Sequence, residues 1–257
     1  MPPIALLTDF GTQDAYVGVM KGVIAAIAPQ VICIDLTHAV PPQDILVAQF
    51  HLMTAYPYFP AGTIYLVVVD PGVGGDRRAV AVQFPWGTVV CPDNGLLTGL
   101  LSHHGPASLH AVALVHAAYW RTPTPSGTFH GRDIFAPVAA RLALGTALNQ
   151  VGQSISPASL VQPPELRPVS PGQDGVIQHI DRFGNLISNI AAADAEQARF
   201  AQIGDRRIPF GTSYSSAAPG QLVALVGSHG WVEVAANGRS ASEVLQARVG
   251  QFIKVRP

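Results

Sequence analysis

The apolar run TIYLVVV at residues 63–69 constrains the fold of this chain more than any other feature of the sequence. A strand with one solvated face alternates apolar and polar residues, whereas this run is apolar almost throughout. Such a run is typical of a strand that is covered on both faces, as in a parallel sheet. The run therefore predicts a buried strand in the middle of a layered domain.

Strand and helix signals alternate along the chain on both sides of that run. The predicted strands are residues 4–7, 31–36, 63–69, 79–84 and 88–91, and the predicted helices are 16–27, 44–56, 96–101 and 134–144. Helices are predicted from apolar residues at helical spacing, and strands from short apolar runs that end in turn residues. The alternation predicts an N-terminal layered α/β domain over residues 1–163, with a mostly parallel central sheet.

The segment VQPPELRPVSPGQDG, residues 161–175, is rich in Pro and Gly and has no periodicity, which predicts an interdomain linker. Beyond it, strands are predicted at residues 175–180, 186–190, 207–210, 222–226, 231–234 and 252–255. Short strands separated by Gly, Asn and Ser turns are typical of a small barrel or sandwich. We therefore predict a smaller all-β, barrel-like C-terminal domain over residues 173–257.

Composition and charge exclude several classes of partner. The formal net charge is -1 and no dense Lys/Arg run occurs, which argues against nucleic acid. No apolar stretch is long enough to span a bilayer, and the start of the chain does not read as a signal peptide. Residues are 48% hydrophobic and only 12% charged, so we expect burial in a core and in a subunit interface. Cys33 and Cys91 are expected to be buried thiols of a cytoplasmic protein.

Acidic residues directly follow several of the predicted strands. Asp9 and Asp14 lie after the first strand, Asp70 lies after the third, and Asp93 and Asn94 follow another. In open α/β sheets, ligands bind outside the carboxyl ends of the strands. One such Asp is often a helix cap or a turn former, but several on successive strands indicate a shared site.

Two further segments add polar groups to this candidate site. SGTFHGRDIF contributes His130, Arg132 and Asp133 in a loop before a predicted helix, where functional residues concentrate. GVGGDRR contains Arg77 and is rich in Gly, but it lacks the GK[ST] ending of a phosphate-binding loop. Its glycines are expected to allow a tight turn after Asp70. No HExxH or other close metal-binding histidine pair occurs.

The second domain has two segments of its own that could bind a ligand. IDRFGNLISNI contains Asp181 and Asn185 in a strand–turn–strand setting, and Phe183 offers an exposed aromatic face. GSHGWVEVAANG contains Ser228 and Glu233. Turn formation is the simpler explanation for the polar residues of both segments.

As a set, these segments resemble the S-adenosylmethionine hydroxide adenosyltransferases, which are S-adenosylmethionine hydrolases related to the fluorinase and the chlorinase. The similar segments are TDFGTQDAYVGVMKG, PPQDI, YPYFPAGTIYLVVVDPGVGGDRR, PDNGLL, TFHGRDIFAPVAA, IDRFGNLISNI and SHGWVEVAANGRSA. The resemblance covers nearly the whole chain in order. It implies an α/β domain followed by a smaller β domain, and a homotrimer whose active sites lie between the first domain of one subunit and the second domain of its neighbour.

The resemblance also implies a role for particular residues. The catalytic set of the family matches Asp70, Arg77 and His130, and its ribose-binding carboxylate matches Asp9. Adenine contacts are implied for Phe183, Asn185, Ala236 and, by stacking, Tyr214. Contacts to the methionine end are implied for Asp14, Asp181, Ser228 and Glu233. The reaction implied is that of S-adenosylmethionine with water to give adenosine and methionine. Because the sulfonium is already a good leaving group, we expect that no metal and no cofactor is needed.

Some positions depart from the halogenating relatives, which carry Tyr and Thr where this chain has Asp70 and Val73, and Ser where it has Gly131. A carboxylate repels a halide ion, so Asp70 favours water as the nucleophile. His229 stands where a halogenating relative has Arg, and a grip of this segment on the methionine carboxylate is therefore not implied.

The sequence favours hydrolysis of S-adenosyl-L-methionine by in-line attack of an activated water on C5′. In this hypothesis Arg77 stabilises hydroxide character, Asp70 orients the water, and His130 completes the hydrogen bonds and relays the proton. One alternative is a metal-dependent hydrolase of a nucleoside-type substrate, with Asp9, Asp14, Asp70 and His130 around Mg²⁺ or Mn²⁺. Arg77 beside Asp70 would repel such a cation. The other alternative is a protein that binds S-adenosylmethionine or adenosine without turnover.

Overall fold

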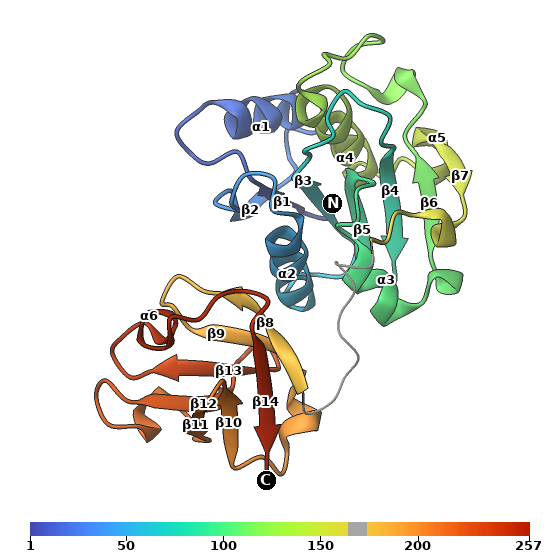
Figure 1. The fold of residues 1–257 in the computed structure, drawn as a ribbon. Coiled ribbons are helices and arrows are strands. Elements are labelled where there is room, and N and C mark those ends of the chain that lie inside the picture. The colour runs from blue at the N-terminus through green and yellow to red at the C-terminus, as the bar shows by residue number, and fades with distance from the viewer. Residues whose placement is uncertain (164–173) are drawn as a thin grey trace. The chain divides into compact units, whose positions relative to one another are not determined.

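The computed structural model describes residues 1–163 and 174–257 of the chain. The chain divides into two compact units, Met1–Arg167 and Pro168–Pro257 (Figure 1). The predicted linker at 161–175 falls for the most part outside the described residues. Within the described ranges, no helix has both the length and the apolar character that a membrane crossing needs.

The first unit is built on a seven-stranded mixed sheet with the order β2-β1-β3-β5-β4-β6-β7. Its strands are β1 Ile4–Thr8, β2 Cys33–Thr37, β3 Thr63–Val68, β4 Ala79–Phe84, β5 Gly87–Pro92, β6 His110–Ala113 and β7 Gln153–Ile155. Strands β2, β1, β3 and β5 pair in parallel. Strands β4, β6 and β7 extend the sheet by antiparallel pairing. The predicted α/β class is confirmed, with the parallel strands forming one half of the sheet.

Helices cover both faces of this sheet. They are α1 Tyr16–Ile27, α2 Ile45–Ala55, α3 Thr98–His104, α4 Ala136–Ala143 and the short α5 Leu148–Val151. One core lies between the sheet and α1 with α4, and a second lies on the other face with α2 and α3 (Figure 1). Strand β3 serves both cores, since Leu66 faces the first and Tyr65 the second. This two-sided burial explains the continuous apolar run in its sequence.

The second unit is an antiparallel sheet of seven strands with the order β11-β10-β14-β8-β9-β13-β12. The strands are β8 Asp174–Ile180, β9 Leu186–Ala191, β10 Phe200–Ile203, β11 Arg206–Pro209, β12 Leu222–Val226, β13 Trp231–Ala236 and β14 Phe252–Arg256. A bridge between Phe210 and Ala224 brings the two edges of the sheet together. The sheet is therefore nearly closed and barrel-like, as predicted, and its core includes Ile177, Val234 and Ile253. One short helix, α6 Ala241–Leu245, precedes β14.

Several elements differ from the sequence prediction. Strands β6, β7 and β10 are not predicted, because each has only three or four residues and carries little apolar periodicity. Helix α4 begins at Ala136 rather than at residue 134, because a π-helical turn, Gly131–Phe135, precedes it. Cys91 is buried as expected, whereas Cys33 is only half-buried because β2 lies at the edge of its sheet.

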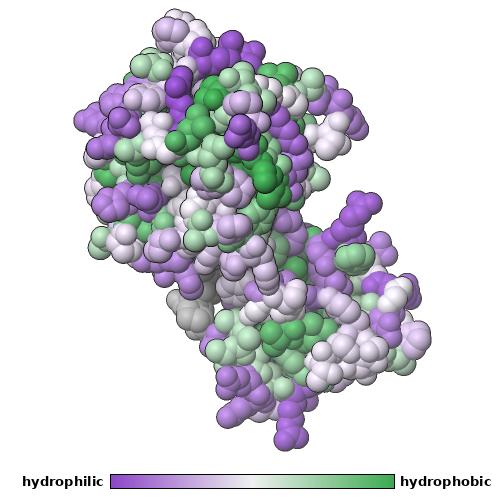
Figure 2. All heavy atoms as spheres, turned by 180° about the vertical axis from the view of Figure 1, so that it is seen from behind, coloured by the Kyte–Doolittle hydropathy of each residue, from purple (hydrophilic) through white to green (hydrophobic). Residues whose placement is uncertain are grey.

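Apolar side chains also lie on the surface of both units. Figure 2 shows hydrophobic patches interrupting the hydrophilic surface of each unit. Large exposed apolar residues of the described chain include Ile32, Tyr58, Phe183 and Phe252. Exposed apolar surface of this kind often marks a binding site or an interface between subunits.

Candidate active site

Asp70 and Arg77 form a buried ion pair at the carboxyl end of the parallel strands. Asp70 comes just after β3, and Arg77 lies two residues before β4. The Arg77 Nε atom donates to both carboxylate oxygens of Asp70, each at 3.0 Å, and Nη2 also donates to Oδ2. The two side chains are only 11% and 5% exposed. A pair this well shielded from water is held in one geometry, so Arg77 is fixed for further contacts.

His130 completes the cluster through the same guanidinium. Nη2 of Arg77 lies 2.7 Å from Nδ1 of His130. Because a guanidinium only donates hydrogen bonds, Nδ1 is the acceptor and neutral His130 carries its proton on Nε2. Burial and the charge of Arg77 lower the pKa of His130, which favours this neutral form. His130 is therefore placed to donate a hydrogen bond from Nε2 in this arrangement, and the proton-relay role expected from the sequence stays a prediction.

Glycines allow the loop after Asp70 to pack against the segment that carries His130. Gly74 has a φ of +77°, and a Cβ atom built on it would lie 2.2 Å from the carbonyl oxygen of Gly127. The loop also turns tightly, because Val73 N donates to the carbonyl oxygen of Asp70 at 3.2 Å. The tight turn expected from GVGGDRR is present, and it brings Arg77 to His130.

Asp133 lies behind the cluster rather than in it. Its fully buried carboxylate accepts hydrogen bonds from the guanidinium groups of Arg121 and Arg132 and from the backbone N–H of Ser126. These donors hold the pKa of Asp133 well below its usual range. The carboxylate ties residues 121–132 together, and the loop that contains His130 is thereby fixed.

Asp93 and Asn94 also have structural contacts. Asp93 is buried and accepts hydrogen bonds from Arg78 Nε at 2.8 Å and from the backbone N–H of Val161 at 2.9 Å. Asn94 Nδ2 donates to the carbonyl oxygen of Val69 at 2.8 Å, at the residue directly before Asp70. Asn94 therefore positions Asp70 from the neighbouring strand, a role that the sequence motif did not reveal.

The two acidic residues that follow the first strand lie in different environments. Asp9 is half-buried, and its Oδ2 accepts a hydrogen bond from the backbone N–H of Gln43 at 2.8 Å. Asp14 is exposed in the loop before α1. Across residues 1–163 and 174–257, no three His, Cys, Asp or Glu side chains gather closely enough to hold a metal ion. Asp9, Asp14, Asp70 and His130 thus do not form a common ligand set there.

An aromatic wall lies beside His130 and was not predicted. The rings of Phe10, Tyr16 and Phe129 meet with centroids 5.3 to 6.0 Å apart. A Cβ atom on Gly131 would lie 3.3 Å from the Phe129 ring and 3.1 Å from Met20 Sδ. Gly131 is therefore enclosed by this wall, which leaves little room for a larger side chain. The TDF, DAY and TFHG motifs contained the signal, since each supplies one of these rings.

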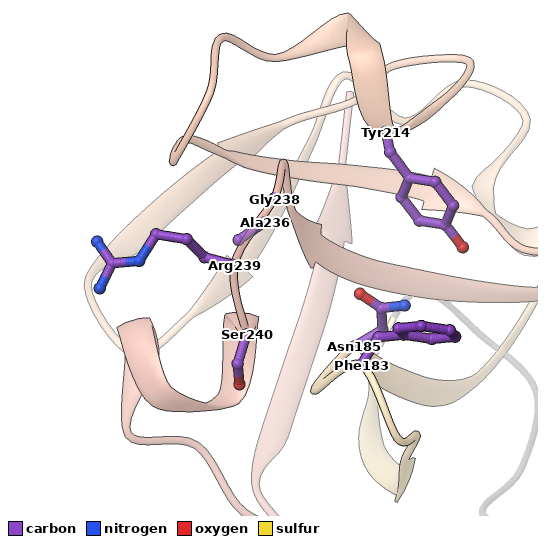
Figure 3. A pocket seen from close by; sticks show the side chains of 7 residues that line it. All are labelled: Phe183, Asn185, Tyr214, Ala236, Gly238, Arg239 and Ser240. Atoms are coloured by element: carbon purple, nitrogen blue, oxygen red, sulfur yellow. The ribbon is translucent and has the colours of Figure 1, made fainter.

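The second unit contains a pocket of about 600 Å³, a volume suited to a small molecule (Figure 3). Its lining residues are Phe183, Asn185, Tyr214, Ala236, Gly238, Arg239 and Ser240. The structure thus brings together all four residues to which the resemblance assigns adenine contacts. Phe183 is 77% exposed, as the sequence led us to expect. The other three lining residues were not predicted, although the motif SHGWVEVAANGRSA includes them.

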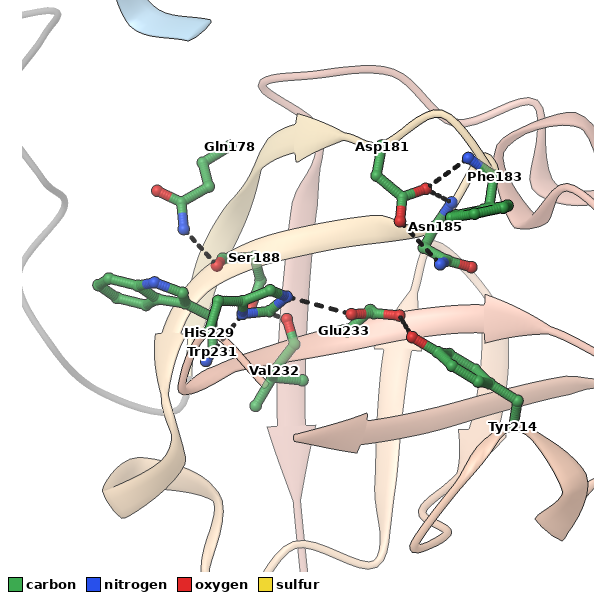
Figure 4. A network of polar contacts seen from close by, with 10 residues as sticks. All are labelled: Gln178, Asp181, Phe183, Asn185, Ser188, Tyr214, His229, Trp231, Val232 and Glu233. Carbon is green, nitrogen blue, oxygen red and sulfur yellow. Dashed lines mark hydrogen bonds and ion pairs between the residues drawn. The ribbon is translucent and has the colours of Figure 1, made fainter. Parts of the chain in front are cut away.

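Asp181 shapes the turn that carries Phe183 and Asn185. Its Oδ1 accepts from the backbone N–H groups of both residues at 2.9 Å, and its Oδ2 accepts from Asn185 Nδ2 at 2.9 Å (Figure 4). Both oxygens thus have partners within the turn, as the turn-forming alternative requires. A contact between Asp181 and the methionine end remains a prediction.

Glu233 is buried and links two other side chains, one of which, Tyr214, lines the pocket. Its Oε1 accepts from the Tyr214 hydroxyl at 3.0 Å, and its Oε2 lies 3.1 Å from His229 Nε2 (Figure 4). The backbone N–H of Trp231 donates to His229 Nδ1 at 3.2 Å, so neutral His229 donates to Glu233 through Nε2. Burial and Glu233 raise the pKa of Tyr214 to about 12. Ser228 is exposed in the adjacent turn between β12 and β13.

Comparisons with known proteins decide the family. Residues 4–152 match the model of the SAM hydroxide adenosyltransferase N-terminal domain, and residues 175–254 match that of the C-terminal domain. The chain belongs to the S-adenosylmethionine hydroxide adenosyltransferase family. The resemblance expected from the sequence motifs is thereby confirmed.

Several curated and solved relatives match this chain over nearly its whole length. An (R)-S-adenosyl-L-methionine hydrolase from Thermus thermophilus is 40% identical, over 99% of this chain and 100% of the relative. One from Salinispora arenicola is 38% identical, over 99% and 97%. A fluorinase from an Actinoplanes species is 31% identical, over 77% and 74%. The crystal structure of an uncharacterized conserved protein from Thermotoga maritima matches with a TM-score of 0.91 and 32% identity, over 98% of this chain and 100% of that one.

Proposed function

We propose that this enzyme hydrolyses S-adenosyl-L-methionine to adenosine and L-methionine by attack of water on C5′. The observation that carries the proposal is the buried guanidinium of Arg77, which contacts Asp70 and His130 together. The curated hydrolases that are 38 to 40% identical over the full chain support the same reaction. Given the names of these relatives, we take the (R) sulfonium epimer as the preferred substrate.

The chemistry requires a positioned water more than an acid. The sulfonium is already a good leaving group: the C5′–S bond breaks, its electron pair stays on sulfur, and neutral methionine departs. A water oxygen forms the new bond to C5′ and loses one proton. We propose that no metal or redox cofactor takes part, because the leaving group needs no further activation. The catalytic task is then to hold water in line and stabilise its developing hydroxide character.

The three side chains divide that task. Nε and Nη2 of Arg77 bind Asp70 and His130, and no protein acceptor of the described residues is paired with Nη1. We assign the Nη1 N–H groups to the attacking water, whose negative charge they stabilise. The Asp70 carboxylate accepts a hydrogen bond from this water, takes up the proton that the water loses as the C5′–O bond forms, and passes it to solvent when the products leave. His130 donates a hydrogen bond to the water oxygen from Nε2. The aromatic wall of Phe10, Tyr16 and Phe129 limits the access of other water.

The pocket of the second unit holds the adenosyl group in this proposal. The exposed ring of Phe183 and the ring of Tyr214 offer flat surfaces for a purine, and the Asn185 amide offers polar groups for its edge (Figure 3). Asp9 binds the ribose. Contacts of the methionine end are assigned to Asp14, Asp181, Ser228 and Glu233. The partner is a small molecule, not a nucleic acid.

We also propose that the working unit is a homotrimer. The Asp70 cluster belongs to the first unit and the pocket to the second, and a neighbouring subunit would supply the second half of each site. The exposed apolar side chains of both units support burial between subunits. Mixing an Arg77→Ala chain with an Asn185→Ala chain should restore activity that neither has alone.

A cytoplasmic location is proposed from the two unpaired cysteines.

Incubation with each sulfonium epimer in ¹⁸O-water and excess chelator tests the function. The expected products are free methionine and adenosine that carries the label at its 5′ oxygen. Loss of activity in chelator, with recovery on adding Mg²⁺ or Mn²⁺, would support the metal-dependent alternative instead. Tight adenosine binding without any product over long incubation would support the binding protein.

A further inference from the structure

The hydrogen bond between Asp181 and Asn185 sets the orientation of the Asn185 amide in the pocket. Asn185 Nδ2 donates to Asp181 Oδ2, so the amide presents its nitrogen to the carboxylate. Its carbonyl oxygen lies on the side away from Asp181 (Figure 4), and no donor among the described residues is paired with it. Asn185 is only 6% exposed, yet its side chain lines the pocket. The oxygen that remains is therefore an acceptor for a ligand.

The opposite orientation of the amide is excluded by charge. If the amide turned over, its carbonyl oxygen would face the Asp181 carboxylate at about the distance of the present hydrogen bond, and two acceptors would repel. Asp181 itself cannot move away easily, because its Oδ1 accepts the backbone N–H groups of Phe183 and Asn185. The backbone thus fixes Asp181, and Asp181 fixes the direction of the Asn185 amide.

We propose that Asp181, acting through Asn185, selects 6-aminopurines against 6-oxopurines; the proposal rests on the assignment of the pocket to the purine. A fixed Asn with a free carbonyl oxygen and one free N–H matches a 6-amino donor and the adjacent ring nitrogen acceptor. A 6-oxopurine places an oxygen where the amino group would be, so two acceptors meet. Asp181 is thus a positioning residue, and Asn185 is the residue that contacts the base.

Calorimetric binding of adenosine and inosine to the full-length protein tests the proposal. One bidentate contact of this kind discriminates by about 10- to 100-fold, so adenosine should bind that much more tightly than inosine. N6,N6-dimethyladenosine, which has no 6-amino donor, should lose a similar factor. Equal affinity for adenosine and inosine would overturn the proposal.

The Asp181→Asn variant provides the decisive comparison. Its new amide keeps its oxygen on the two backbone N–H groups and turns its NH₂ toward Asn185, whose amide must then reverse. The adenosine preference should fall at least about 10-fold, with a gain in absolute affinity for inosine. A merely structural role would weaken both nucleosides equally. An unchanged ratio in a folded variant contradicts the proposal, and wild type with the dimethyl analogue still tests it if the variant does not fold.

Two controls separate this result from the rest of the proposals. Asp205→Asn removes a charge from an exposed turn of the same unit and should leave the ratio unchanged. Hydrolysis of S-adenosylmethionine is measured separately. Hydrolysis with equal binding of the two nucleosides disproves only the base selection, whereas selective binding without hydrolysis disproves only the reaction.

Discussion

Nη2 of Arg77 donates a hydrogen bond to Nδ1 of His130 over 2.7 Å, and this contact requires His130 to be unprotonated at Nδ1. Protonation would place a second positive charge against Arg77 and break the hydrogen bond. Burial and Arg77 lower the pKa of His130, so the active form persists to pH values below the ordinary value of about 6.5. We expect kcat/KM to be constant above that value and to fall only at lower pH. A pH profile measures this limb, and a fall that begins well above pH 6.5 would contradict the assignment.

The lowered pKa of His130 also makes the free energy of unfolding depend on pH. The unfolded chain protonates His130 near pH 6.5, whereas the folded chain protonates it only at lower pH. Between these two pH values the unfolded state binds more protons, so stability rises with pH. The stabilising contribution is present above pH 6.5 and lost below. Urea unfolding of wild type and His130→Asn should show a smaller pH dependence in the variant over this window.

Adjacent arginines allow a matched test of Arg77. Arg77→Ala should lower kcat by about 10²- to 10³-fold with little change in KM, because a donor to developing negative charge is lost. Arg78→Ala removes the same side chain one residue later, where the guanidinium contacts Asp93 and Ser159. It should lower stability and leave kcat near the wild-type value. Steady-state kinetics with both variants checks the difference, and equal losses of kcat would remove the assignment of Arg77.

Gly74 and Gly62 provide a second matched pair. Both have positive φ, +77° and +85°, so alanine at either costs about 1–2 kcal/mol in backbone strain. Only at Gly74 would the new Cβ meet another atom, the carbonyl oxygen of Gly127 at 2.2 Å. Gly74→Ala should therefore also displace Arg77 from His130 and reduce kcat, whereas Gly62→Ala should reduce stability alone. Similar kcat values for the two variants would show that the loop contact is unimportant for turnover.

Asp133→Asn tests the support behind His130. The variant loses charge-assisted hydrogen bonds with Arg121 and Arg132, and we expect a loss of about 2–3 kcal/mol in unfolding free energy. Because the folded pKa of Asp133 is depressed, its contribution is present above its ordinary pKa near 3.9 and lost as the pH falls through the folded value. Acid unfolding followed by circular dichroism should therefore show less pH dependence in the variant than in wild type. A variant as stable as wild type at pH 7 would contradict this role.

The architecture could be predicted from the sequence because the pattern of apolar residues depends directly on which faces of a strand or helix are buried. The run at residues 63–69 predicts β3 correctly, since two helical layers cover it. The bounds of α1 also agree with the prediction. Strands β6, β7 and β10 were missed because their few residues owe their strand conformation to pairing partners.

The sequence predicted which residues belong to the candidate site, but not how they contact one another. Strand ends and motifs indicated Asp70, Arg77 and His130. They could not show that Asp133 and Asp93 are structural, because this follows from contacts with Arg121 and Val161, which lie outside the local motifs. The sequence also did not indicate which atom donates in the hydrogen bond between Arg77 and His130. The tautomer of His130 follows from Arg77 Nη2, a contact across 53 residues of chain that no local pattern encodes.

Arg77 and Arg78 are neighbours in the chain, yet one binds the reacting cluster and the other binds Ser159 near the last described residues of the first unit. Asp93 also holds the backbone of Val161 through its second oxygen. The contacts of Arg78 and Asp93 thus hold residues 159–161 against the loop that follows β3 and the end of β5. A shortened first unit intended for separate study must therefore keep residues through Val161, because removing them would take away the partners of Arg78 and Asp93 and lower the stability of the unit.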